Sequence, residues 1–144
     1  MGTTGRRIGK QAGIGLLAGL LAGLILGAGG RLAMTAIALA AGLEVGFSLG
    51  GTLEVFATGL LIGAPAGLVF VFLKNYAPIP AVWRGGAFGA LLFLGLVLFP
   101  LPAARGSVEA VGQLPLTLAL FGALFVAYGI AVSLLVERLV SRLQ

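Results

Sequence analysis

The sequence predicts an all-α membrane protein, a single domain built as a bundle of four transmembrane helices. Composition is the first reason, because 60% of the 144 residues are hydrophobic and 9% are charged. A soluble domain covers its surface with roughly 25% charged residues, whereas a surface that faces lipid needs no such cover. The second reason is that the apolar residues form runs about as long as the ~20 residues that cross a bilayer as a helix.

Four apolar runs give the expected spans, at about 12–42, 50–73, 85–101 and 114–136. Pro100 and Pro102 end the third run, and Pro115 stands at the start of the fourth, where a helix tolerates proline. The first run would make a helix of ~48 Å, which exceeds the ~30 Å hydrocarbon core. We expect either one long, tilted helix or a helix that breaks at the Gly29-Gly30 pair.

The charges in the loops predict which ends share a side of the membrane. With four spans, the two tails and the middle loop lie together and hold most of the basic residues: Arg6, Arg7, Lys10, Lys74, Arg84, Arg138 and Arg142. The other side holds Arg105, with Glu44 and Glu109. Because basic loops stay inside, we expect a multi-pass protein of the inner membrane with both termini in the cytoplasm and the lipid bilayer as its partner.

The missing residue types exclude several kinds of chemistry. The chain has no cysteine and no histidine, which removes disulfides, thiolate chemistry and the commonest metal and haem ligand. Its net charge of +5 is spread over the ends of the apolar runs, where it faces lipid headgroups rather than nucleic acid. We therefore predict no enzymatic activity, no cofactor, no metal and no nucleic-acid partner.

Small residues at every fourth position predict where the helices touch, since membrane helices associate through close packing. The first two spans carry Gly15, Gly19, Gly23 and Gly27, then Gly59, Gly63 and Gly67; the others carry Gly85 and Gly89, then Ala119, Ala123, Ala127 and Ala131. We read these stripes as a glycine zipper inside one bundle. An oligomer seam and a pore lining are the alternatives. Pro65, in the middle of the second span, predicts a kink.

Arg31 and Glu54 form the candidate site, because a charge at bilayer depth is costly and rarely placed there without a role. A hairpin with its turn near residues 44–48 offsets the two by ~10 Å along the helix axes, so we expect an ion pair between them or a ligand site. Two alternatives stay open: Arg31 marks an anion site at a helix break, or both side chains snorkel to the interface.

The remaining polar side chains at depth are expected to find partners close by. Threonine and serine can return their hydroxyl to the carbonyl four residues earlier in their own helix. Tyr128 is the large one among them, so we predict that its hydroxyl needs a partner from another helix.

The GRLAM run at 30–34, the GFSLGGT run at 46–52 and Trp83-Arg84-Gly85 resemble four-span membrane proteins of GC-rich bacteria. This resemblance implies the four-span layout and carries no assigned activity. Arg31 with Gly51-Thr52-Leu53 is also similar to small fluoride channels, but Phe56 stands where that pattern has asparagine, and its Phe-Thr-Thr-Phe-Ser run is missing.

Two functional classes remain. The first, which we favour, is a structural or accessory membrane component that associates with itself or with a larger membrane complex. The second is a small ion or anion channel, or a carrier, that uses Arg31 and Glu54.

Overall fold

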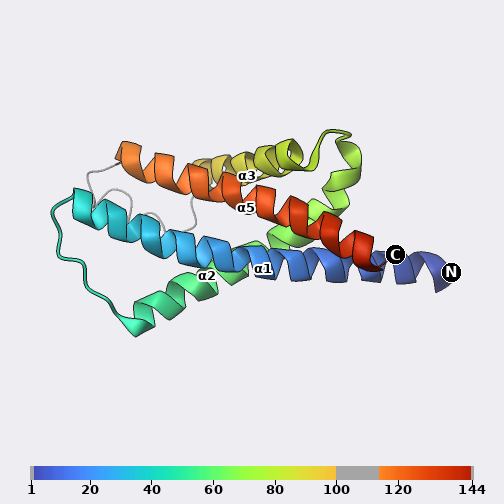
Figure 1. The fold of residues 1–144 in the computed structure, drawn as a ribbon, viewed down its shortest axis with the longest axis horizontal. Coiled ribbons are helices and arrows are strands. Elements are labelled where there is room, and N and C mark those ends of the chain that lie inside the picture. The colour runs from blue at the N-terminus through green and yellow to red at the C-terminus, as the bar shows by residue number, and fades with distance from the viewer. Residues whose placement is uncertain (1, 100–113, 144) are drawn as a thin grey trace.

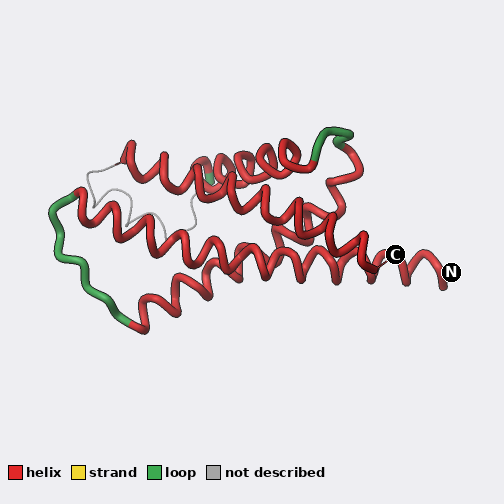
Figure 2. The backbone as a smooth tube through the Cα atoms, in the orientation of Figure 1, coloured by secondary structure: helices red, strands yellow, loops and turns green. Residues whose placement is uncertain are grey.

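The structure, a computed structural model, describes residues 2–99 and 114–143. Its helices are α1 (Gly2–Ala40), α2 (Leu49–Leu73), α3 (Ala81–Leu98) and α5 (Leu114–Leu143), and the short 3₁₀ helix η1 (Lys74–Tyr76) follows α2 directly (Figure 1). Within these ranges the backbone is helix and loop, with no strand (Figure 2). In the described part of the chain, four helices are long and apolar enough to cross a membrane, which confirms the all-α, four-helix part of the prediction.

Helix α1 is continuous, so of the two alternatives the single long helix is found and the break at Gly29-Gly30 does not occur. The two glycines serve close packing instead: a Cβ on Gly29 would meet the side chain of Leu124 in α5, and one on Gly30 would lie 3.4 Å from Val55 in α2. At 39 residues the helix is ~58 Å long, about twice the hydrocarbon core. Its N-terminal turns extend beyond the rest of the bundle (Figure 1).

Three helix bounds differ from the expected spans. Helix α1 begins at Gly2 rather than near residue 12, α3 begins at Ala81 rather than 85, and α5 continues to Leu143 rather than 136. Apolar runs mark the part of a helix that lies in lipid, and these helices continue past that part into charged sequence. The expected end of the third span, with Pro100 and Pro102, lies outside the described residues.

The helices form two antiparallel hairpins, α1 with α2 and α3 with α5, and α1 packs on α5 to join them (Figure 1). Both chain ends lie at the same end of the molecule. Helix α1 stops in a Schellman motif, in which Gly42 takes a φ of 69° and the Leu43 amide donates to the Ala38 carbonyl at 2.9 Å. Ser48 then caps α2 by accepting from the Gly51 amide at 3.0 Å.

The largest fully buried side chains come from α2 and α5: Phe70, Val71, Tyr128, Val132, Ser133 and Val136. This face of α5 is not the expected one. Ala119, Ala123 and Ala127 are exposed, whereas Ala131 packs against the core cluster, so the predicted alanine ridge is wrong for three of its four residues. The backbone of α5 comes close to α3 at Phe125 and Gly129 instead, where built Cβ atoms on Gly89 and Gly85 would meet it.

Candidate functional site

Helices α1 and α2 meet along a line of glycines, called here the glycine seam and made of Gly15, Gly19, Gly23, Gly27, Gly59, Gly63 and Gly67. The facing pairs are Gly15 with Gly67, Gly19 with Gly63, and Gly23 with Gly59. A Cβ on Gly63 would stand 2.6 Å from the Gly19 carbonyl oxygen, and one on Gly23 would stand 2.8 Å from that of Gly59. Backbone lies against backbone, so a side chain at these positions would force the helices apart.

A second close approach joins α3 to α5. Built Cβ atoms on Gly85 and Gly89 would meet the backbone of Gly129 and Phe125 respectively. The glycine stripes expected in the first three spans therefore pack within one chain in this structure. Their contacts leave the outward faces of α2 and α3 apolar and exposed, as Leu61 (76% exposed) and Leu91 (67%) show.

Arg31 lies on α1 beside the loop that connects α1 to α2. Its Nη2 donates to the Gly46 carbonyl at 3.4 Å, and the guanidinium stands 5.8 Å from the centroid of the Phe47 ring. The side chain thus binds the chain segment that closes the first hairpin. The proposed anion site at a freed helix N-terminus is wrong, because α1 has no break there.

Glu54 does not pair with Arg31. In the described part of the chain, the ion pair found runs between Arg84 and Glu137, and Glu54 is exposed. The reason is rotation about α2: its neighbour Val55 faces Gly30 of α1, and one residue turns a helix by ~100°. The offset along the axis was compatible with pairing, but the two side chains point to different surfaces. A ligand role for either residue stays a prediction.

Other polar groups at depth are satisfied as expected. The hydroxyls of Thr35, Thr52 and Thr58 donate to the carbonyls four residues earlier, at 3.0, 2.9 and 2.8 Å. Tyr128, fully buried, donates to the Gly63 carbonyl of α2 at 2.7 Å, which confirms that it needs a partner from another helix. Ser133 is the exception, since its buried Oγ has no hydrogen-bond partner among the described residues.

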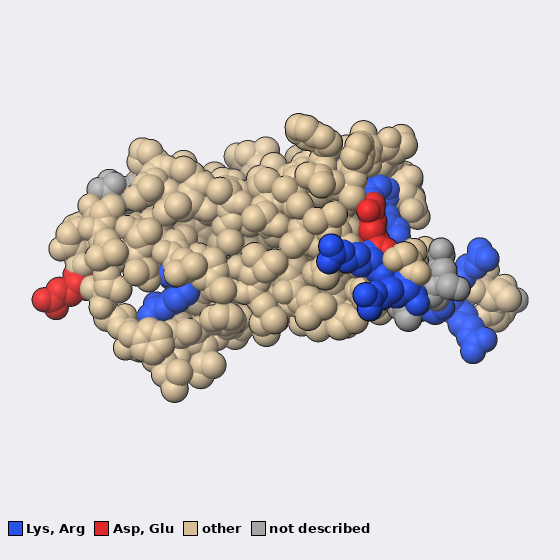
Figure 3. Space-filling view, viewed as in Figure 1, with Lys and Arg blue, Asp and Glu red and all other residues tan. Residues whose placement is uncertain are grey.

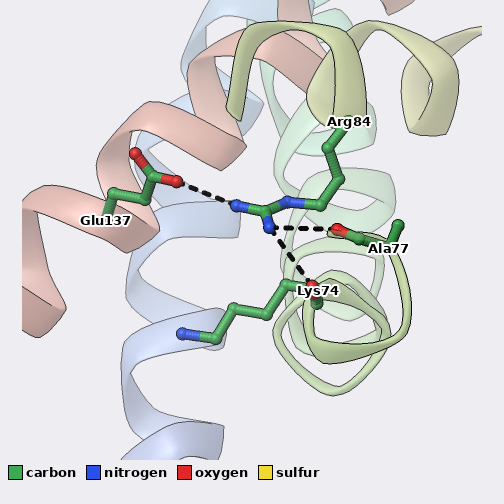
Figure 4. A network of polar contacts seen from close by, with 4 residues as sticks. All are labelled: Lys74, Ala77, Arg84 and Glu137. Carbon is green, nitrogen blue, oxygen red and sulfur yellow. Dashed lines mark hydrogen bonds and ion pairs between the residues drawn. The ribbon is translucent and has the colours of Figure 1, made fainter. Parts of the chain in front are cut away.

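Arg84 is the centre of a polar network that the sequence did not point to (Figure 4). Its Nη2 donates to Glu137 Oε1 at 2.8 Å, and its Nη1 donates to the carbonyls of Lys74, at 3.2 Å, and Ala77, at 3.5 Å. Its guanidinium also stands 6.0 Å from the centre of the Phe70 ring. Arg84 therefore ties α3, α5 and the η1 turn together. A signal in the sequence existed, since Glu137 is the acidic residue in the basic C-terminal tail.

Charge is distributed unevenly along the molecule. Figure 3 shows basic side chains gathered at the end that carries both chain ends, while the long middle of this face has no charge. That end holds the N-terminal turns of α1, the η1 turn, the start of α3 and the last turns of α5. The grouping of basic residues at one end, expected from the sequence, results from this arrangement of helices.

The chain matches no protein-family model, no curated protein and no solved structure. The resemblance to four-span proteins of GC-rich bacteria and the weaker one to fluoride channels therefore stay predictions. The residues of this chain and their geometry are the basis on which its function can be inferred.

Proposed function

We propose that this protein is a structural or accessory component of the inner membrane, with both termini in the cytoplasm. The observation that carries the proposal is the uncovered stripe of small residues on α5, formed by the exposed Ala119, Ala123 and Ala127. Small residues four apart let another helix approach closely within lipid. Because the glycine seam is already occupied inside the chain, this alanine stripe is the place for a second copy or another membrane protein.

Helix α3 supports the same proposal. Its buried residues are Gly85 and Gly89, so most of its surface is open to lipid or to a partner. The hydrogen bonds of the polar side chains within the helical spans also favour a packing role. Tyr128 and the threonines are hydrogen-bonded to backbone carbonyls, and a transport path would need polar groups that converge on a shared space.

The test is the oligomeric state and the protein composition of the sample purified in a mild detergent. We expect the purified particle to have a mass larger than that of one chain with its bound detergent, or to contain a second protein. Ala123→Leu should release the associated species without lowering the unfolding temperature, since this side chain faces outward. The matched control is Ala57→Leu, an exposed alanine on α2, which should change nothing. A wild-type protein that is monomeric and alone at every concentration would refute the proposal.

A second candidate function is a small ion channel or carrier, and the charge of Arg31 favours it. Within the described residues, its guanidinium is held by one 3.4 Å hydrogen bond and a contact with Phe47, and Glu54 does not pair with it. Anion and cation flux into liposomes, measured for the wild type, Arg31→Ala and Glu54→Ala, tests this function. Flux in the wild type that is lost in a folded Arg31→Ala variant would establish transport and overturn the accessory role.

A further inference from the structure

A cavity of about 610 Å³ opens at the basic end of the bundle, where α1, α5 and the η1 turn meet. It is lined by Arg7, Lys10, Gln11, Ile14, Lys74, Asn75 and Val140. The four residues from α1 are spaced as i, i+3, i+4 and i+7, so they lie on one face of that helix. The cavity is therefore built by three separate segments and is not the surface of one helix.

The lining changes from apolar to cationic along the helix axis. Its floor is Ile14, 8% exposed, and Val140, which packs against the same core cluster. Toward the N-terminus, Lys10 and Arg7 lie about one and two turns from Ile14 and bring positive charge, and Lys74 lines the same cavity from η1. Gln11 and Asn75 also line the cavity, and their side-chain amides can donate hydrogen bonds.

The η1 turn is held in place from its other side. Arg84 donates to the Lys74 carbonyl at 3.2 Å and pairs with Glu137. Figure 4 shows the Lys74 side chain extending on the same side as Glu137, with no bond drawn from its amino group to that carboxylate. Arg84 holds the Glu137 carboxylate at 2.8 Å, and the Lys74 side chain lines the cavity.

We propose that this cavity binds the phosphate headgroup of an anionic phospholipid. Lys74 and Asn75 follow the apolar helix α2 directly, which is where a membrane helix meets the lipid headgroups. Cations at this depth attract phosphate, and basic pockets between membrane helices are suited to acidic lipids. The apolar floor favours a lipid over free phosphate, because it offers a surface to the acyl chains beside the headgroup.

This lipid site requires the four helices to lie in a bilayer and is independent of the accessory role. Its test is native mass spectrometry of the intact protein in detergent micelles, with dioleoylphosphatidylglycerol or dioleoylphosphatidylcholine added. The two lipids have the same acyl chains, so a difference in binding reports the headgroup. We expect the wild type to retain phosphatidylglycerol preferentially, and each of Arg7→Gln and Lys74→Gln to weaken that binding about fivefold.

The matched control is Arg142→Gln, which removes the same charge at the same end of the bundle, outside the cavity lining. It should leave lipid retention unchanged, and Lys74→Arg, which keeps the charge, should restore it. Equal losses in Arg7→Gln and Arg142→Gln would overturn the site, because they would show only diffuse attraction. Full displacement of the lipid by an equal concentration of glycerol phosphate would overturn the lipid assignment and indicate a soluble phosphate ligand.

Discussion

The Tyr128 hydroxyl makes a single hydrogen bond that links the two hairpins, at a depth where water is scarce. It donates to the Gly63 carbonyl at 2.7 Å, in the middle of the glycine seam. Hydrogen bonds between membrane helices average about 0.6 kcal/mol and reach about 1.7. The bond therefore fixes how α5 sits on α2 more than it determines the total stability.

Replacing Tyr128 with phenylalanine should lower the free energy of unfolding by about 0.5–1.5 kcal/mol. The phenylalanine ring keeps the packing of the tyrosine ring. The Gly63 carbonyl, which loses the tyrosine hydroxyl as a donor, remains part of the backbone of helix α2. Equilibrium unfolding in mixed SDS micelles measures the change. Tyr76→Phe is the control, because Tyr76 is 84% exposed and should show no loss. Equal effects in the two variants would contradict the structural role of the bond.

The attraction between Arg84 and Glu137 should contribute little to stability, although the Arg84 side chain as a whole should contribute more. The Arg84 side chain is 17% exposed and that of Glu137 is 50% exposed, so water screens the attraction. A double-mutant cycle with Arg84→Gln and Glu137→Gln should give a coupling of about 0.2–1 kcal/mol. Arg84→Gln alone should cost more than Glu137→Gln, because it also removes the bonds to two carbonyls. A coupling as large as the whole Arg84 effect would contradict this description.

At the scale of the element, the glycine seam is what makes α1 and α2 a hairpin. A Cβ on Gly19 would meet the backbone at Gly63 and Ala64. Gly13, less than two turns earlier on α1, has nothing within 4 Å of its built Cβ. The two positions share a helix and a residue type, and they differ in whether another backbone lies against them.

Gly19→Ala should therefore destabilise the protein by about 1–3 kcal/mol, as overpacking does. Gly13→Ala should be neutral or stabilising by up to about 1 kcal/mol, because alanine is the better helix former. Unfolding in mixed micelles again measures both. A loss in Gly13→Ala comparable to that in Gly19→Ala would show that glycine serves these helices through flexibility rather than close approach.

Apolar length and small-residue spacing were enough to predict the four helices, and the spacing also identified the residues of the glycine seam. Spacing was not enough to predict which face of a helix packs against the core, because that depends on the rotation of the helix about its axis. Ala119 and Ala123 have the right spacing for a packed ridge but lie outward, because spacing alone does not tell which side of α5 faces the core. Glu54 was misplaced for a related reason, since axial offset does not define direction around the helix.

Long-range pairs were also beyond the sequence. Arg84 and Glu137 are 53 residues apart, and their contact depends on how α3 and α5 cross. The cavity beside them joins Arg7, Lys74 and Val140 from three segments, a combination that no local pattern contains. The i, i+3, i+4, i+7 spacing on α1 was readable, but the partner segments appear only once the bundle is assembled.

At the scale of the whole molecule, the position of both chain ends at one end of the bundle predicts the topology. Seven basic residues belong to that end, from Arg6 to Arg142, whereas Glu44 lies in the loop at the opposite end. Basic segments resist translocation, so that end should remain in the cytoplasm. The chain has no cysteine, which allows single introduced cysteines to report their side of the membrane without background.

We expect Val45→Cys, in the loop between α1 and α2, to react with a membrane-impermeant maleimide in bacterial spheroplasts. Thr3→Cys and Ser141→Cys should react only in inside-out vesicles, because the start of α1 and the end of α5 are predicted to lie on the cytoplasmic side. All three positions are exposed, so a difference in labelling reports sidedness rather than burial. Labelling of Thr3→Cys and Ser141→Cys from opposite sides would refute four crossings, and reversal of all three would leave the fold intact while overturning the cytoplasmic assignment.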